Sequence, residues 1–209
     1  FHCKDCNFYS TLIIQEAERS ARYAHIEKLH CERISQRGIA RATGVSRSTI
    51  IRHLKKKTFQ PIATTGTPVS SRPTLELDEL WSYVGNKQTK VWMWLARERE
   101  TRRIVGIAFG DRSETTCRAL WQSLPADYRK RAVIYSDHWE RYALVVPSKR
   151  HRVVDTGSGE TNHVERFNNT LRQRCSNLVR KCLSFSKDRR LHELRIRLFI
   201  DHYNSTLSV

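Results

Sequence analysis

A segment without apolar periodicity divides the chain and constrains its fold more than any other feature. Residues 58–74 contain three prolines, one glycine and many serines and threonines. This composition is typical of a linker. We therefore expect a small N-terminal module over residues 1–57 and a larger domain over residues 75–209. Together these parts suit a chain of 209 residues.

The N-terminal module has the pattern of three helices. Residues 16–33 show helical periodicity. Two shorter helices are expected over residues 35–42 and 46–55, because each range begins with a serine, a good N-cap, and Gly44 lies between them. Two short helices joined by a turn after a longer helix predict a trihelical helix-turn-helix module.

The last of these helices carries side chains that suit DNA recognition. We expect Arg47 to reach guanine in the major groove, and Ser48 or Thr49 to reach base edges or phosphate. Later basic residues are placed for phosphates, namely Arg52, Lys55 and Lys56. The alternative is a solvated basic helix in a protein–protein module. The turn chemistry and the charge of the whole chain favour DNA.

That charge is strongly positive. The chain carries 38 lysines and arginines against 21 aspartates and glutamates, a formal net charge of +17. The partner is therefore expected to be nucleic acid or an anionic membrane surface. No run approaches the ~20 apolar residues that span a bilayer, and 39% hydrophobic residues exclude a wholly disordered basic tail. Residues 75–150 have the smallest net positive charge of the three parts of the chain, +4, because many of the acids lie there. Acids in a protein that binds a polyanion can hold cations against that polyanion.

The six cysteines do not have the density of a secreted disulfide scaffold, so we expect a reducing cytoplasm. Cys3 and Cys6 have the spacing of half a zinc site, but a structural zinc needs four ligands and no second pair follows. Because the chain begins with Phe1 rather than Met, we expect its natural N-terminus, and any further ligand pair, to lie upstream. In this chain we expect a pair of thiols rather than bound Zn²⁺.

Apolar runs in the larger domain predict an α+β fold with a mixed sheet. Three adjacent strands with short links indicate a meander, and the later strands need crossover connections. The strands are expected over residues 75–84, 90–96, 103–110, 131–136 and 151–155, and the helices over residues 113–124, 161–180 and 188–203.

Three acids of this domain are candidates for one catalytic site. Asp78 lies on the first strand, where alternation puts Glu76, Asp78 and Leu80 on one face. Asp137 follows the apolar strand 131–136, and Glu165 lies on a helix beside its apolar stripe. Two strand aspartates and a helix glutamate can converge on two Mg²⁺ ions, which prefer carboxylate oxygens. Such a pair activates a water or a 3′-hydroxyl for in-line attack on a phosphodiester.

Plainer roles remain open for the same residues. Asp137 can cap a helix, and Glu165 can pair with Arg172 on the helix surface. Three histidines lie near the acids, and we expect them to be structural or to contact phosphate rather than to bind metal: His138, His151 and His163.

Three stretches resemble the transposases of the insertion sequence 1 family. They are Leu77-Asp78-Glu79-Leu80-Trp81, Tyr135-Ser136-Asp137 and Val164-Glu165-Arg166-Phe167-Asn168-Asn169-Thr170-Leu171-Arg172. A basic residue seven positions after the glutamate, here Arg172, is typical of these DDE transposases. The resemblance implies a ribonuclease-H-like fold with Asp78, Asp137 and Glu165 as the metal-binding triad. It also implies that Arg172 contacts DNA near the transposon end, and that Cys3 and Cys6 are the remnant of a zinc-binding element.

The resemblance implies a function as well. We expect a DNA transposase that binds double-stranded DNA, both the terminal inverted repeats of its element and the target. It would cleave 3′ ends and transfer strands with two Mg²⁺ or Mn²⁺ ions, as a homo-oligomer that is at least a dimer, with no membrane partner. The rival is a helix-turn-helix regulator whose second domain is an inactive dimerisation module. A third reading is a nuclease of the same fold that cuts without joining.

Overall fold

The computed structural model describes residues 2–8, 13–56, 71–155, 157–179 and 185–207, with the backbone alone for residues 13–15. The chain forms two compact units, Phe1–Thr58 and Phe59–Val209. Most of the expected linker, as well as Lys57 and Cys182, lies outside the described residues.

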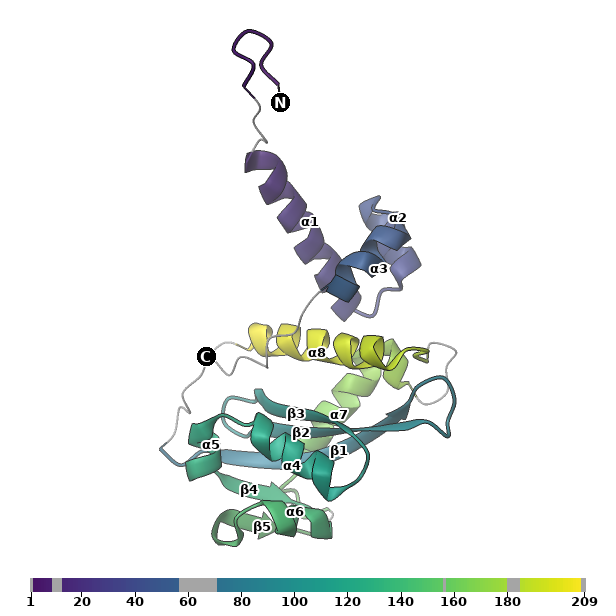
Figure 1. The fold of residues 1–209 in the computed structure, drawn as a ribbon. Helices are drawn as coiled ribbons and strands as arrows, with labels where there is room; N and C mark the ends of the chain where they lie inside the picture. The colour runs from purple at the N-terminus through teal and green to yellow at the C-terminus, as the bar shows by residue number, and fades with distance from the viewer. Residues whose placement is uncertain (1, 9–12, 57–70, 156, 180–184, 208–209) are drawn as a thin grey trace. The chain divides into compact units, whose positions relative to one another are not determined.

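The N-terminal unit contains the three helices expected from the sequence, α1 (Ile13–Cys31), α2 (Gln36–Thr43) and α3 (Arg47–Lys56) (Figure 1). The Ser35 Oγ caps α2 by accepting from the Gly38 N–H at 3.0 Å, and the Ser46 Oγ accepts from the Thr49 N–H at 3.2 Å at the start of α3. Gly44 ends α2 at a φ of +69°, which glycine adopts without strain. One apolar residue from each helix is fully buried: Ile26, Ile39 and Ile50.

The larger unit is built on a five-stranded mixed sheet with the order β3-β2-β1-β4-β5. Its first three strands form the expected antiparallel meander, and β4 and β5 add in parallel beside β1. The strands are β1 (Thr74–Tyr83), β2 (Lys90–Glu98), β3 (Ile104–Gly110), β4 (Val133–Ser136) and β5 (His151–Val153). The last strand ends earlier than expected.

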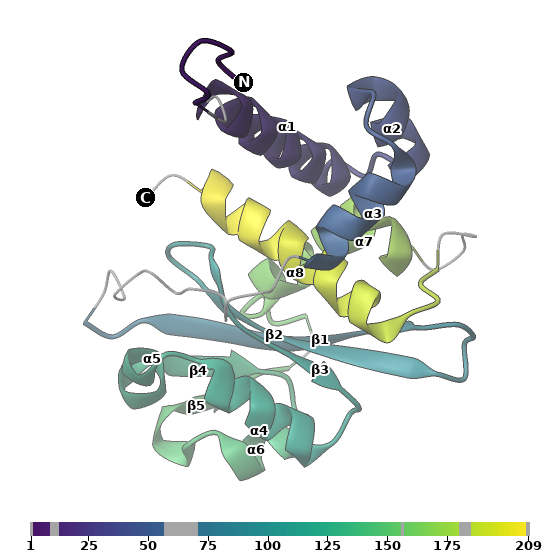
Figure 2. The same ribbon diagram turned by 45° about the horizontal axis from the view of Figure 1, so that its top comes forward.

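Helices cover both faces of this sheet. Figure 2 shows α4 and α6 on one face and α8 on the other. The helices of the unit are α4 (Glu114–Ser123), α5 (Ala126–Arg131), α6 (Glu140–Val145), α7 (Asn162–Arg174) and α8 (Arg189–Thr206), with short 3₁₀ turns at Ser148–Arg150 and Ser176–Leu178. Near the end of α8, Asn204 pairs with both backbone groups of Ile104, at 3.0 and 2.9 Å, and so blocks part of the exposed edge of β3.

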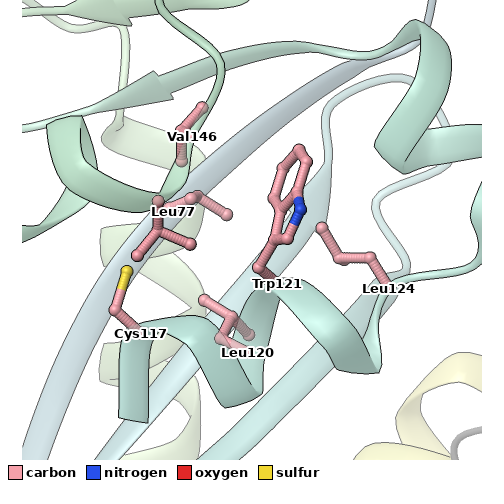
Figure 3. Close-up of a pocket in the computed structure, with 7 residues that line it drawn as sticks. Leu77, Cys117, Leu120, Trp121, Leu124 and Val146 are labelled. Carbon is pink, nitrogen blue, oxygen red and sulfur yellow. The ribbon is translucent and has the colours of Figure 1, made fainter. Parts of the chain in front are cut away.

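Strand alternation separates the apolar core from the polar face. Leu75 and Leu77 belong to one apolar cluster with Leu120 of α4 and Leu124, the residue that caps this helix. Figure 3 shows the crevice that Leu77 lines with Cys117 and Trp121. Burial raises the pKa of the Cys117 thiol to about 12. No acid lines this crevice, so the candidate chemistry belongs to the opposite face of β1.

The helix expected over residues 161–180 is shorter than predicted. It ends at Arg174, and the backbone turns at Cys175 into a 3₁₀ turn. That turn buries Asn177, whose Nδ2 lies 3.0 Å from the Nδ1 of His192. A helix that continued past Arg174 would place Asn177 elsewhere and lose its contact with His192. Tertiary packing therefore decides where α7 ends.

Candidate active site

Asp78 occupies the centre of the polar face of β1. Its Oδ1 accepts from the Glu79 N–H at 2.8 Å, and its Oδ2 accepts from the Asn168 Nδ2 of α7 at 2.6 Å. Burial, above all, and the negative charges of Glu79, Asp137 and Glu165 together raise the pKa of the Asp78 carboxyl to about 7, against the lowering effect of the Glu79 N–H bond.

Asp137 reaches the same edge from the neighbouring strand. Glu76 of β1 pairs with Tyr135 of β4 in parallel, so Asp78 and Asp137 each lie two residues further along adjacent strands. The Oδ1 of Asp137 accepts from the Trp139 N–H at 3.1 Å, which turns the chain toward α6. Asp137 follows the carboxyl end of β4, where α/β sheets place their sites, and Asp78 lies at the corresponding position in the middle of β1.

Glu165 comes to this edge on the first turn of α7. It is exposed, and its Oε1 accepts from the Thr161 Oγ1 at 2.9 Å. The apolar stripe of Val164, Phe167 and Leu171 is buried against the sheet, as the spacing indicates. Asn168, one turn after Glu165, makes the contact with Asp78, so the helix that carries Glu165 is docked directly on the strand that carries Asp78.

The three acids are electrostatically coupled but not gathered around one point. Among the residues that the structure describes, no three His, Cys, Asp or Glu side chains form a ready-made metal site. The donors nevertheless fit Mg²⁺ or Mn²⁺ in kind, because all are hard carboxylate oxygens. A divalent cation beside Asp78 would favour its ionised form, which burial first and the neighbouring acids second disfavour.

Glu79 faces the opposite side of β1. Its carboxylate accepts from Tyr142 at 2.9 Å and from Arg112, whose guanidinium lies 4.7 Å from the Trp139 ring. Burial, above all, raises the pKa of Glu79. Glu79 is thus held by hydrogen bonds on the α6 side of the sheet, opposite to the face of Asp78.

Two polar residues of the site were missed from the sequence. Glu76 is fully buried and contacts α7, and Asn168 is buried against Asp78. Alternation had placed Glu76 on the face of Asp78, which was the available signal. Of the three histidines, His163 bonds Glu76, His151 bonds Ser136 and His138 bonds Asp155.

The residues expected to bind DNA lie on two helices. On α3, Arg47, Arg52 and Lys55 are exposed. The hydroxyls of Ser48 and Thr49 both lie within 3.0 Å of the Ser46 Oγ, in the network that caps the helix. Arg172 lies in the last turn of α7, two turns after Glu165.

The expected cysteine pair lies in a turn at the start of the chain. Cys6 is exposed and Cys3 is partly so. Backbone hydrogen bonds from Cys6 and then Asp5 lower the pKa of Cys3, which favours its thiolate. Cys31, by contrast, is buried in α1. The described residues thus supply two sulfur donors, half of a tetrahedral zinc site.

A five-stranded mixed sheet with helices on both faces is compatible with a ribonuclease-H-like domain. Residues 74–205 match the family model described as IS1 transposase, and the chain belongs to this family. None of the described helices is long and apolar enough to cross a bilayer.

Relatives and a solved structure resemble the chain. Insertion element iso-IS1n protein InsB of Shigella dysenteriae is 38% identical over 129 residues, 61% of this chain and 94% of that protein. Insertion element IS1 protein InsB of Shigella flexneri is 37% identical over 130 residues, 61% of this chain and 95% of that protein. The cryoEM structure of a simian T-cell lymphotropic virus intasome with PP2A regulatory subunit B56 gamma has a TM-score of 0.37 and 11% identity, covering 84% of this chain and 64% of that chain.

Proposed function

We propose that the chain is a DDE-type DNA transposase that binds the ends of its element, cleaves them to free 3′-hydroxyls and joins these to target DNA. The observation that carries the proposal is the docking of α7, which bears Glu165, on β1 through the 2.6 Å hydrogen bond from Asn168 to Asp78, with Asp137 following the parallel strand β4 beside β1. Membership of the IS1 transposase family supports the same function.

Asp78, Asp137 and Glu165 would hold two Mg²⁺ or Mn²⁺ ions through their carboxylate oxygens. Two such ions, when bound, activate a water or a 3′-hydroxyl and stabilise the leaving oxygen. Asn168 keeps one oxygen of Asp78 engaged, which fixes the orientation of that carboxylate. No side chain forms a bond to phosphorus in this scheme.

Bond changes balance in both steps. In cleavage, a water oxygen bonds to phosphorus and the bond from phosphorus to the 3′-oxygen breaks, which leaves a 3′-hydroxyl and a 5′-phosphate. In joining, that 3′-oxygen loses its proton to solvent and bonds to a target phosphorus, and the displaced target 3′-oxygen takes up a proton from solvent to become a hydroxyl. One phosphodiester bond is formed for each that is broken, so joining needs no external energy source.

End recognition is assigned to the N-terminal unit acting as a helix-turn-helix module. Arg47 and Arg52 on α3 are exposed and suit a guanine edge and phosphate, respectively. Because Ser48 and Thr49 bond to Ser46, we assign base reading to Arg47 first. Arg172 would contact DNA near the cleaved end. Two ends must be held together for insertion, so the active form would be at least a dimer.

The test is an assay for joined product with labelled end DNA, target DNA and Mg²⁺. Asp78→Asn, Asp137→Asn and Glu165→Gln should each abolish cleavage and joining while DNA binding is retained. Glu114→Gln is the control, because this exposed acid on α4 pairs with Arg118 one turn away. Strand transfer by the triad variants would refute the site. Binding without cleavage by the unmodified chain would favour a regulator, and cleaved but unjoined ends would indicate a nuclease.

A further inference from the structure

One fully buried carboxylate joins the strand and the helix that carry the proposed triad. Glu76 of β1 has no exposed side-chain surface. Its Oε1 accepts from the Arg99 Nε at 2.8 Å and lies 2.9 Å from the His163 Nδ1, and its Oε2 accepts from the Val164 N–H at 2.9 Å. A charge this deeply buried is costly unless each oxygen is bonded, and here both are.

The contact with Val164 lies at the N-terminus of α7. The first N–H groups of a helix have no partner within the helix, and they attract negative charge. Glu76 supplies that charge from inside the sheet, since Val164 is in the first turn of α7. The start of the helix, where Glu165 lies, is therefore fixed to β1 by a charged acceptor rather than by apolar packing alone.

Arg99 extends these contacts to two further segments. Its Nη2 donates to the Glu160 carbonyl at 2.5 Å, just before α7, and its guanidinium lies 4.6 Å from the centre of the Tyr135 ring on β4. A guanidinium over an aromatic face is attracted by the ring. Arg99 thus links β4 and the segment before α7 to the carboxylate on β1.

The sequence positions in this cluster share one relationship. We name Glu76, Arg99, Tyr135 and His163 the clamp. Asp78 is two residues after Glu76, Asp137 is two after Tyr135, and Glu165 is two after His163. On each strand, two residues is the repeat that returns to the same face. Asp78 therefore lies on the same face as Glu76, and Asp137 just beyond β4 continues the alternation from Tyr135, whereas His163 and Glu165 are about 200° apart around α7 and share only its first turn.

We propose that Glu76 is a positioning residue, which sets the spacing of Asp78, Asp137 and Glu165 for divalent ions by docking α7 and β4 on β1 through the clamp. The proposal rests on the function proposed above. Glu76 itself does not touch metal or DNA. Its effect passes through the placement of the three carboxylates, as partners of metal ligands orient those ligands in other metal sites.

A second buried glutamate of the same sheet serves as a control for a purely structural role of Glu76. Glu98 of β2 is also buried, and its Oε2 accepts from Tyr128 at 2.7 Å and Thr101 at 2.5 Å. Glu98 pairs with Leu75 in the strand register, on the α4 side of the sheet, and has no bond to α7. Glu76→Gln and Glu98→Gln each remove a buried charge of the same sheet, and only Glu76 bonds to α7, although the Oε1 of Glu98 has no hydrogen-bond partner among the described residues.

The experiment measures binding of Mn²⁺ alone to the full chain by electron paramagnetic resonance, together with joined product as a function of Mn²⁺ concentration. Glu76→Gln should weaken Mn²⁺ binding by roughly 10- to 100-fold and raise the half-saturating Mn²⁺ concentration by a similar factor, with a much smaller change in the rate at saturation. Arg99→Lys keeps the positive charge but loses the separate guanidinium donors to Glu76 and Glu160. It should weaken Mn²⁺ binding too, but by a smaller factor. Glu98→Gln should bind Mn²⁺ as the unmodified chain does.

Two contrary results can be distinguished. If Asp78→Asn abolishes Mn²⁺ binding while Glu76→Gln and Arg99→Lys leave it unchanged, the clamp proposal is overturned and the proposed function stands. The clamp is also overturned if Glu98→Gln weakens Mn²⁺ binding as much as Glu76→Gln does, because the effect is then one of stability alone. If Asp78→Asn neither weakens Mn²⁺ binding nor impairs joining, the proposed function itself fails.

Discussion

Asn168 of α7 donates a 2.6 Å hydrogen bond from its Nδ2 to the Oδ2 of Asp78 on β1. The side chain is buried, and its Oδ1 has no hydrogen-bond partner among the residues that the structure describes. The Asn168 amide and the Glu79 N–H are thus the two donors to the carboxylate whose pKa is raised to about 7. The contact links the helix of Glu165 to the strand of Asp78, and its chemistry can be changed by a single substitution.

Asn168→Asp should replace that hydrogen bond with repulsion between two acids. Two carboxylates at this separation do not both ionise readily. We expect a loss of roughly 1–3 kcal/mol in the free energy of unfolding at pH 8, and a smaller loss at pH 5, measured by urea denaturation. Asn169→Asp, the same change at the exposed neighbouring residue, should cost only a few tenths of a kcal/mol. Equal losses for the two variants at pH 8 would contradict this account.

Asp78 should make the folded chain less stable as the pH rises. Its pKa is about 7 when folded and near its ordinary value of 3.8 when unfolded, so the folded state binds more protons between these values. The contribution of Asp78 to stability should therefore fall from pH 4 to pH 7. Asp78→Asn should raise the free energy of unfolding at pH 8 by roughly 1–3 kcal/mol and have little effect at pH 4. A lower stability for this variant at pH 8 would show that the carboxylate is compensated in the folded chain.

His192 should act with the opposite sign. It is fully buried among Ser82, Asn177 and Ser186, and burial, with the charges of Arg195 and Arg189, lowers its pKa to about 4. The unfolded chain then binds the extra proton between pH 6.5 and pH 4, so this contribution to stability is lost as the pH falls through that range. The loss approaches about 3 kcal/mol at pH 4.

His192→Gln should flatten that acid dependence while lowering stability at neutral pH. Melting temperatures at pH 7.5 and pH 4.5 provide the measurement. His138→Gln serves as the control, since His138 is an exposed residue. The assignment would be wrong if the difference between the two melting temperatures were the same for His192→Gln as for the unmodified chain.

DNA binding should depend on α3. Arg47→Ala and Arg52→Ala should each weaken binding to the element's ends and reduce the slope of log affinity against log salt by about one. Fluorescence anisotropy over a salt series measures both quantities. Arg22→Ala, an exposed residue of α1, is the matched control. If Arg22→Ala were as damaging as Arg47→Ala, the charge of the unit rather than its third helix would govern binding.

The elements with a strong repeat were predictable and the short ones were not. Alternation over β1 and the apolar runs of β2 and β3 identified the meander, and the Val164–Phe167–Leu171 stripe identified α7. Helices α5 and α6, of six residues each, are too short to show a helical period. Their anchors, Tyr128 and Tyr142, are buried by partners distant in the sequence.

The three acids remain predicted metal ligands, whereas the residues that support them could not be predicted from the sequence. Asp78, Asp137 and Glu165 stand out by position, at a strand, a strand end and a helix face. Glu76 looks like any surface acid in the sequence, because its partners Arg99 and His163 are 23 and 87 residues away. Burial of an acid follows from long-range packing, which neither composition nor periodicity reports.

The most direct test of the central claim is the location of Mn²⁺ by anomalous X-ray diffraction from crystals grown with that ion. We expect two anomalous peaks about 4 Å apart, bounded by the carboxylates of Asp78, Asp137 and Glu165, and their loss in Asp78→Asn. The absence of any peak among these three carboxylates, with Mn²⁺ bound at other acids of the same crystal, would contradict the account.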